Sequence, residues 1–294
     1  NGRDRLVSVD MGGTSFDIGL VENGVCAVTT EGSFQGLPVR VPIIDLHIIG
    51  AGGGSIAFRD PGGALQVGPQ SAGAEPGPAC YGRGGTLPTV TDANLVLGRL
   101  SADYFNGGRM RLHAESAHRA VRALAEQMGM SVEETALGIV RVVNANMAKG
   151  IAAVTILRGI DVRDFSLLSF GGAGGVHAVE LARALSMREA IVPPLPGTFS
   201  AVGLLVTDVR HDYVVALGGI RANDVVPENL EASYREMERQ AAEELAAEGF
   251  QGSSATFVRI ADLKVAGQTY ELSLPLPESG PVTRTGLDAL LDAF

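Results

Sequence analysis

The sequence predicts an α/β protein, and three observations carry this prediction. Short strand patterns fill the first 50 residues, two helical patterns occupy the middle, and a strand–glycine–helix–strand unit follows them. Alternation along the first part and the turn at residues 22–24 indicate a β-meander. The strands expected there cover residues 6–10, 16–21, 25–30 and 43–49.

Two helices are predicted next, over residues 114–128 and 132–157. In the second helix, apolar residues recur at spacings of three and four, which indicates one core-facing stripe. The stripe comprises Ile139, Val143, Met147, Ile151 and Val154. A βαβ-like unit with parallel strands should follow, and its elements are a strand at 165–170, a helix at 177–185 and a strand at 190–192.

Residues 60–90 contain eight Gly and five Pro, so we expect no regular element there and a functional or mobile segment instead. Near the end, the pattern predicts an amphipathic helix and a hairpin, at 227–248, 255–265 and 270–274. We expect three portions: a Gly-rich portion at 1–110, a helical portion at 111–220, and an α/β segment at 221–294.

Composition restricts the function. The 294 residues are 46% hydrophobic and carry a formal charge of −10, the wrong sign for neutralising a nucleic-acid backbone. Two cysteines without a C-x-x-C spacing fit neither a disulfide scaffold nor a zinc knuckle, and no apolar run of membrane-spanning length is evident. We therefore expect a cytoplasmic protein that binds neither nucleic acid nor membrane.

The first chemical motif is Asp10-Met11-Gly12-Gly13-Thr14-Ser15-Phe16-Asp17, between two strands of the expected hairpin. Gly12 and Gly13 permit positive φ, so their backbone N–H groups could point into one concavity, while Thr14 and Ser15 add hydroxyl donors. Asp10, at the strand end, suits Mg²⁺ held through water or the orientation of a nucleophile. A glycine-rich hairpin turn with a solvated Asp is the equally weighted alternative.

The second motif, Ser169 to His177, leads from a strand through four glycines into a helix. A helix N-terminus flanked by glycines can receive an anion or a planar base. His177 occupies the third small position of a dinucleotide fingerprint and no acid closes the next strand, which disfavours a Rossmann dehydrogenase. A turn that is glycine-rich for tight packing alone remains open at this point.

Other sites are weaker. The chain has no Walker A motif and no nucleophile-elbow serine, and its five His have no spacing suited to a zinc site. Asp45 and His47 alternate along an expected strand and could face a substrate, although a structural hydrogen-bonded His is about twice as probable on general grounds. Arg83, in the Gly/Pro-rich segment, is a third candidate for the substrate cleft.

Several of these motifs together resemble the hydantoinase A/5-oxoprolinase family. The resemblance covers residues 6 to about 275 and runs through long motifs in the family's order. They are Asp10–Asp17, Ile49–Ala57, Gly68–Ala74, Pro76–Gly85, Thr89–Asn94 and Gly171–Ala178.

The resemblance implies an actin-like ATPase fold, with two ribonuclease-H-like domains and ATP with Mg²⁺ in the cleft between them. Asp10 would act in catalysis and hold Mg²⁺ through water. The phosphate-binding residues would be Gly12, Gly13, Thr14 and Ser15, and the adenosine-binding residues Gly171, Gly172, Gly174, Gly175 and His177. The first phosphate hairpin of that fold is missing, so we expect an N-terminally incomplete fold with weak nucleotide binding and no turnover by this chain alone.

The implied activity is that of an ATP-dependent amidohydrolase subunit. Such a subunit phosphorylates the carbonyl oxygen of a small cyclic amide or imide, and a hydantoinase B-type partner subunit or domain completes ring opening. A ketone carboxylase subunit of the same fold and a non-catalytic actin-like nucleotide-binding scaffold are the alternatives.

Overall fold

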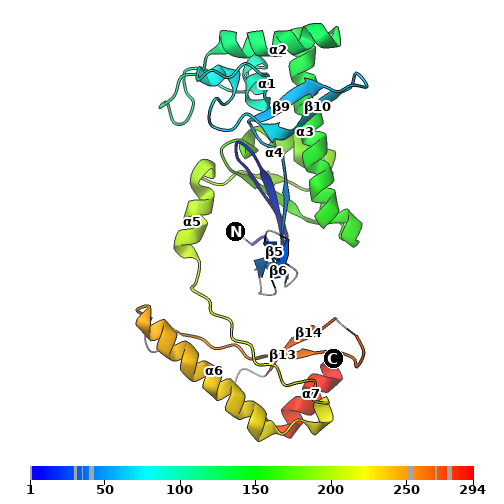
Figure 1. The fold of residues 1–294 in the computed structure, drawn as a ribbon, viewed down its shortest axis with the longest axis vertical. Coiled ribbons are helices and arrows are strands. Elements are labelled where there is room, and N and C mark those ends of the chain that lie inside the picture. The colour runs from blue at the N-terminus through cyan, green and yellow to red at the C-terminus, as the bar shows by residue number, and fades with distance from the viewer. Residues whose placement is uncertain are drawn as a thin grey trace. The chain divides into compact units, whose positions relative to one another are not determined.

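A six-stranded mixed sheet organises the first part of the chain (Figure 1). The computed structural model describes residues 2–29, 32–34, 36–39, 43–250, 255–268, 270–276 and 280–294. The strand order is β12-β11-β1-β2-β3, and β8 also pairs with β2. The strands are β1 (Leu6–Met11), β2 (Phe16–Glu22), β3 (Val25–Cys26), β8 (Leu46–Ile49), β11 (Ser166–Phe170) and β12 (Ala190–Ile191).

The predicted hairpin and parallel unit are confirmed, since β1 and β2 are antiparallel and β12 lies parallel to β11. The parallel pairing of β11 with β1 was not predicted. The strand expected at 25–30 is split into β3 and β4, and its residue 30 lies outside the described residues. Two short pairs complete this part: β4 (Val28–Thr29) with β7 (Ile43–Ile44), and β5 (Gly32–Phe34) with β6 (Leu37–Val39).

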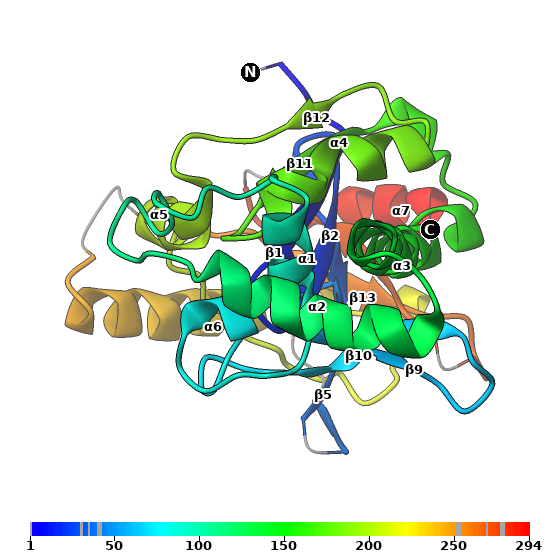
Figure 2. The same ribbon diagram turned by 90° about the horizontal axis from the view of Figure 1, so that it is seen from above.

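Two helices, α3 (Val132–Val154) and α4 (Gly174–Ala184), pack on one face of the sheet (Figure 2). The predicted stripe of α3 is buried, and the strand side chains beneath the helices are also inaccessible to solvent, namely Val7, Val9, Met11, Phe16 and Ile18. A capping box of Ser131 and Glu134 starts α3, because each side chain accepts from the backbone N–H of the other residue.

The segment Val132–Arg158 is also the one described helical stretch long and apolar enough to cross a membrane. Half of its most apolar window is buried inside the chain. The packing of its apolar stripe on the sheet accounts for that hydropathy without a bilayer.

A smaller group of strands and helices also packs around α3. It contains β9 (Ser55–Arg59), β10 (Leu65–Ser71), α1 (Val90–Val96) and α2 (Ala114–Met128). The expectation that residues 60–90 lack regular structure is therefore wrong for β10, which pairs with β9. The glycine and proline at 68–69 coincide with an irregularity in strand register between Val67 and Ser71, so the strand accommodates them at a bulge.

A buried carboxylate ties this group of elements together. Asp92 of α1 is inaccessible to solvent and accepts hydrogen bonds from the Thr89 N–H and hydroxyl and from two N–H groups of the turn at Ala79 and Cys80, over 2.7–3.2 Å. Burial, with the Asp92 charge beside it, raises the pKa of the Cys80 thiol. Cys80 is thus an inert, buried thiol in the native state, whereas Cys26 is exposed.

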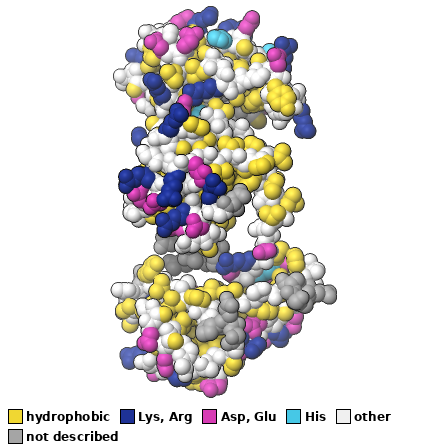
Figure 3. Space-filling view, turned by 180° about the vertical axis from the view of Figure 1, so that it is seen from behind, with side chains coloured by type: hydrophobic (Ala, Val, Ile, Leu, Met, Phe, Trp, Pro, Cys, Tyr) yellow, Lys and Arg dark blue, Asp and Glu magenta, His cyan; other side chains and the backbone are white. Residues whose placement is uncertain are grey.

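The chain divides into two compact units, residues 1–207 and 208–294. The boundary expected near residue 110 falls inside the first unit, and the one near 220 falls shortly after the division. The first unit also contains α5 (Phe199–Val206) and four short 3₁₀ turns: η1 (Ala79–Tyr81), η2 (Ile156–Arg158), η3 (Val162–Asp164) and η4 (Pro196–Thr198). On the described face shown in Figure 3, acidic and basic side chains are interspersed rather than gathered into one basic stripe.

The second unit consists of one long helix, a hairpin and a short helix. Its elements are η5 (Ala222–Asp224), α6 (Pro227–Ala247), β13 (Ile260–Leu263), β14 (Leu272–Pro275) and α7 (Arg284–Ala293). The predicted helix and hairpin are confirmed, although β13 is shorter than the expected 255–265 because only its end pairs with β14.

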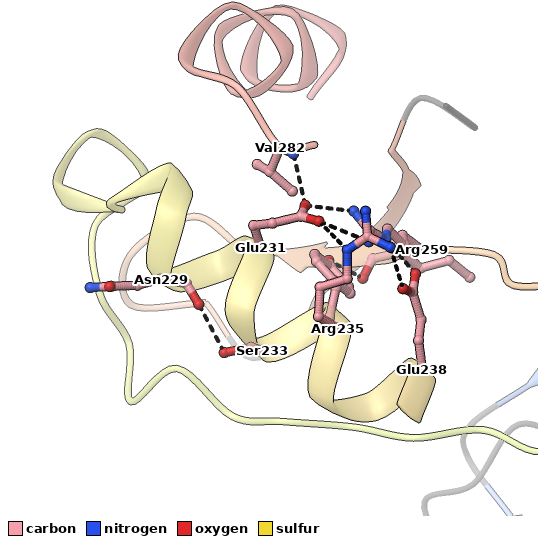
Figure 4. Close-up of polar contacts among 9 residues, drawn as sticks. Asn229, Glu231, Ser233, Arg235, Glu238, Arg259 and Val282 are labelled. Atoms are coloured by element: carbon pink, nitrogen blue, oxygen red, sulfur yellow. Dashed lines mark hydrogen bonds and ion pairs between the residues drawn. The ribbon is translucent and has the colours of Figure 1, made fainter. Parts of the chain in front are cut away.

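One arginine joins the hairpin to α6 (Figure 4). The Arg259 side chain is only 12% exposed and pairs with Glu231 and Glu238, each at 2.7 Å. Its guanidinium also lies 5.2 Å from the centre of the Tyr234 ring, and Glu231 accepts from the Val282 N–H at 2.9 Å. Because Arg259 pairs with two largely buried carboxylates, its loss would leave both with only the exposed Arg235 as cationic partner.

We expect Arg259→Ala to destabilise the second unit by about 3 kcal/mol, since breaking a largely buried ion pair typically costs that much. The matched control is Arg239→Ala on α6, where the paired carboxylates of Glu236 and Glu243 are 66% exposed. This substitution should destabilise the second unit by under about 0.5 kcal/mol. Hydrogen exchange of α6 peptides in urea measures both. Equal effects of the two variants would contradict this account of Arg259.

Candidate functional site

The two predicted glycine motifs emerge side by side from the sheet. β1 and β11 are parallel neighbours with Asp10 opposite Phe170, so the turns that follow them leave from the same edge. In open α/β sheets, ligands bind outside the carboxyl ends of such strands. We call residues 10–15, 50–55 and 171–175 the glycine edge.

The loop of residues 50–55 packs on the first turn through its backbone. The Gly53 N–H donates to the Gly12 carbonyl at 3.0 Å, and the Gly54 N–H donates to the Gly13 carbonyl at 2.7 Å. A Cβ on Gly52 would lie 2.6 Å from backbone atoms of Gly13 and Thr14. Only glycine at position 52 therefore allows this approach.

The second turn also contacts the first. Gly171 has φ +83°, and a Cβ there would collide with the Asp10 carboxylate and the Met11 carbonyl. The Ala173 N–H donates to the Met11 carbonyl at 2.9 Å. The two motifs are thus in direct contact where they leave β1 and β11.

The backbone donors differ from the expectation at two residues. Neither Gly12 nor Gly13 has positive φ, and the Gly12 N–H is used inside the turn, where it donates to the Ser15 carbonyl at 3.3 Å. Among the described residues, the N–H groups without a hydrogen-bond partner at this edge include those of Gly13, Thr14, Ser15, Gly172, Gly174 and Gly175. The last two belong to the first turn of α4, where the helix dipole favours an anion.

Asp10 and Asp17 are opposite each other across the β1–β2 hairpin. The Ser200 hydroxyl donates to one oxygen of Asp10 at 2.7 Å. One oxygen of Asp17 is buried and has no hydrogen-bond partner among the described residues. Burial raises the pKa of Asp17, the Ser15 hydroxyl opposes that rise, and the charge of Asp10 adds to it. Two neighbouring carboxylates that repel each other suit a cation.

This arrangement fits Mg²⁺ in its usual protein environment. Mg²⁺ keeps several waters and binds through one or two carboxylates together with substrate phosphates. Among the described residues, no group of three or more His, Cys, Asp or Glu side chains forms a complete metal cage. Asp10 and Asp17 could therefore hold the ion only together with water and a phosphate ligand.

His177 occupies a different place from the predicted one. It is inaccessible to solvent, and both of its ring nitrogens are engaged, Nδ1 at 2.7 Å from Asn144 Oδ1 and Nε2 at 3.2 Å from Asn94 Nδ2. Burial, with the Arg99 charge nearby, lowers its pKa to about 4, although Glu180 opposes the shift. Its imidazole is hence neutral near pH 7 and does not line the surface of the glycine edge.

The three suggested substrate-cleft residues are not brought together at the glycine edge. Asp45 precedes β8 at the end away from the Asp10–Ser15 turn and pairs with Arg158 at 2.6 Å. His47 lies within β8, opposite Ile18. Arg83 is an exposed residue in the loop after η1. A shallow hollow of about 440 Å³ lies elsewhere, between residues 102–103 and the start of α2.

The comparisons with known proteins agree with the motifs. A family profile described as hydantoinase/oxoprolinase matches residues 1–213. The chain belongs to this family. Among its relatives, the caprolactamase subunit alpha of Pseudomonas jessenii is 40% identical over all of this chain and 42% of its own length. The 5-oxoprolinase 1 of Arabidopsis thaliana is 36% identical over 83% of this chain and 20% of its own length.

Solved family structures share the fold. The ATP-dependent caprolactamase of Pseudomonas jessenii matches all of this chain with a TM-score of 0.77 at 39% identity, over 43% of its own chain. Nucleotide-free acetone carboxylase matches with a TM-score of 0.84 at 28% identity, over 42% of its own chain. The chain therefore spans less than half the length of these family members.

Ser200 and Thr91 also make contacts at the glycine edge, and the sequence did not predict either of them. Ser200 reaches Asp10 because the η4–α5 segment lies over the end of β11, where the Gly171 N–H donates to the Pro196 carbonyl at 2.9 Å and the Phe199 ring centre lies 5.1 Å from that of Phe170. The Thr91 hydroxyl donates a hydrogen bond to the Gly53 carbonyl at 2.8 Å. The break at Pro196-Gly197, shortly after β12, is the sequence signal for the first of these contacts.

We expect Gly52→Ala to destabilise the first unit by about 2 kcal/mol, because the added methyl collides with backbone rather than with a flexible side chain. Gly13→Ala, on the facing turn, meets nothing within 4 Å and serves as the control. The urea dependence of Cys80 alkylation measures unfolding of this unit. If Gly13→Ala proved as costly as Gly52→Ala, close packing would not be the reason for glycine at 52.

His177 should make stability pH-dependent. Since its folded pKa of about 4 lies below the unfolded value of 6.5, its contribution is complete above pH 6.5 and falls as the pH approaches 4. The total loss is roughly 3 kcal/mol. The stability difference between the wild type and His177→Gln should therefore shrink from pH 7 to pH 4 in urea unfolding followed by circular dichroism. A difference that stays constant would show that His177 is not held neutral.

Proposed function

We propose that this chain is the ATP-binding part of an ATP-dependent amidohydrolase subunit of the hydantoinase/oxoprolinase type. One observation carries the proposal: unpartnered N–H groups from two turns converge at the end of two parallel strands, beside Asp10. Oriented N–H groups of this kind stabilise the charge of a transferring phosphoryl group. The names of the relatives, caprolactamase and 5-oxoprolinase, support a cyclic amide as substrate.

The fold that we propose is actin-like, completed by a first phosphate hairpin outside this chain. Three antiparallel strands, β1, β2 and β8, are followed by two parallel strands, each preceded by a helix packed on the same sheet. This arrangement supports a ribonuclease-H-like domain. Because the chain spans less than half of its relatives, the remaining part of the nucleotide site would come from the rest of the protein.

In this proposal the residues of the glycine edge act on the phosphates. The N–H groups of Gly13 and Thr14 would receive the phosphoryl oxygens, and those of Gly172, Gly174 and Gly175 would orient the remainder of the nucleotide. Asp10 would position the amide carbonyl oxygen or a water of the Mg²⁺ ion, with Asp17 beside it. Mg²⁺ would neutralise charge that develops on the phosphates.

Phosphorylation solves a definite chemical problem. Resonance makes an amide carbon a poor target for water, whereas transfer of the γ-phosphoryl group to the carbonyl oxygen, with release of ADP, makes the carbon electrophilic. Addition of water to that carbon would give a tetrahedral intermediate from which the protonated ring nitrogen leaves, so that the C–N bond breaks and the ring opens. Hydrolysis of the resulting acyl phosphate would then release phosphate and the carboxylate. We propose that a hydantoinase B-type partner carries out these hydrolytic steps, in line with relatives that are subunits of larger enzymes.

A ketone carboxylase subunit is the alternative, since the acetophenone carboxylase gamma subunit of Aromatoleum aromaticum is 37% identical over 98% of this chain. A non-catalytic nucleotide-binding scaffold is the third possibility. We place the protein in the cytoplasm on the basis of its two free cysteines.

The test of the proposal is nucleotide binding followed by substrate-dependent phosphate release. We expect the chain alone to bind ATP with Mg²⁺ weakly in calorimetry, without turnover. With a B-type partner and the rest of its polypeptide, phosphate release should depend on a lactam or hydantoin. Release that depends on a ketone and bicarbonate would instead identify the carboxylase, and ATP binding without any substrate dependence would identify the scaffold.

We expect Gly13→Ala and Gly172→Ala each to weaken ATP binding at least tenfold without loss of stability. In the structure, a Cβ at either position meets no protein atom within 4 Å, so it would meet only a ligand. Gly203→Ala, which is equally unobstructed but lies in α5, is the matched control. Unchanged affinity in both edge variants would place the nucleotide elsewhere.

A further inference from the structure

A chain of hydrogen bonds runs from the surface to the interior behind the glycine edge. Arg99 donates to one oxygen of Glu180 at 2.7 Å, and the Asn144 amide donates to the other at 2.5 Å. Asn144 Oδ1 then lies 2.7 Å from His177 Nδ1, and the opposite ring nitrogen lies 3.2 Å from Asn94 Nδ2. This series of hydrogen bonds connects α1, α3 and α4.

The carboxylate of Glu180 fixes the donor and the acceptor in each of the hydrogen bonds that follow it. A carboxylate accepts only, so Asn144 must turn its NH₂ toward Glu180 and its carbonyl oxygen toward His177. His177 Nδ1 must therefore carry a proton. The neutral ring then offers a lone pair on Nε2, and the Asn94 NH₂ donates to it. Among the described residues, Arg99 and Glu180 are the charged groups that act on this ring.

The first turn of α4 needs such support. It begins with Gly174 and Gly175, the poorest helix formers other than proline, and its N-cap residue, Ala173, provides no side-chain hydrogen bond. His177, three residues after Gly174, anchors this turn from the inside to Asn94 on α1. The same helix carries Thr91, which holds the Gly53 carbonyl.

We propose that His177 is a positioning residue, whose neutral imidazole locks the first turn of α4 to α1 and α3 and thereby fixes the spacing between residues 171–175 and the loop of residues 50–55. The inference rests on the proposed function in one respect, namely that the ligand so positioned is ATP. His177 itself contacts no ligand and acts through the backbone donors of Gly174 and Gly175.

Three variants test the proposal. His177→Leu fills similar space but removes the partners of Asn94 Nδ2 and Asn144 Oδ1, whereas His177→Gln retains one donor and one acceptor. Leu181→Ala destabilises the same helix by removing a buried side chain outside the network. Asn94→Ala, which removes only the donor to Nε2, replaces His177→Leu should that variant not fold.

We expect His177→Leu to raise the Kd for ATP with Mg²⁺ at least tenfold, measured by calorimetry on folded protein. His177→Gln and Leu181→Ala should both remain within threefold of the wild type. A purely structural role would instead make affinity follow stability, so that His177→Leu and Leu181→Ala weaken binding equally, and that result would overturn the proposal.

A second readout separates this inference from the proposed function. The amides of Ala173 and Gly53 donate across the glycine edge, and their hydrogen exchange needs no nucleotide. Relative to Val143 in α3, we expect exchange of both amides to accelerate at least tenfold in His177→Leu and not in Leu181→Ala. If the wild type binds no ATP, the proposed function fails, and this exchange ratio alone decides the positioning role: acceleration supports it and an unchanged ratio refutes it.

Discussion

The parallel pairing of β1 with β11 is the constraint on which the rest of the site depends. It brings together two turns that are about 160 residues apart in the sequence, with Asp10 opposite Phe170. Every other feature of the glycine edge refines that juxtaposition. The loop of residues 50–55 bonds to the outer side of the first turn, and the η4–α5 segment lies over the end of β11.

Backbone groups make most of the contacts at this edge. Gly52 and Gly171 are required because a side chain would separate the turns, while Gly13 and Gly172 border open space. These are two different uses of glycine, one for close packing and one for access. The buried polar chain through His177 supports the edge from behind, where neither glycines nor a helix cap could hold the first turn of α4.

The sequence was sufficient to predict the elements that have a clear periodicity. The β1–β2 hairpin, α3 with its apolar stripe, and the parallel unit of β11, α4 and β12 all follow from spacing and turn residues. β10 was missed because its pairing uses backbone groups, which tolerate Gly68 and Pro69 at a bulge. α4 begins three residues earlier than expected, since its opening glycines resemble loop.

At the site, the sequence could indicate which segments matter but not which of their atoms are free. That His177 points inward to two asparagines depends on partners far away in the chain. The Gly12 N–H is used by the local bond to Ser15, which the presence of two glycines does not reveal. Ser200 illustrates the same limit, because its contact with Asp10 exists only once β11 and η4 are in place.

The separation of β1 from β11 also has a consequence for biosynthesis. The first strand leaves the ribosome long before its parallel neighbour, and until Phe170 has emerged it pairs only with β2. Nascent chains shorter than this would hold an unpaired strand edge, the kind of surface on which chaperones act. Folding of the glycine edge is thus a late event in translation, governed by the most distant contacts in the unit.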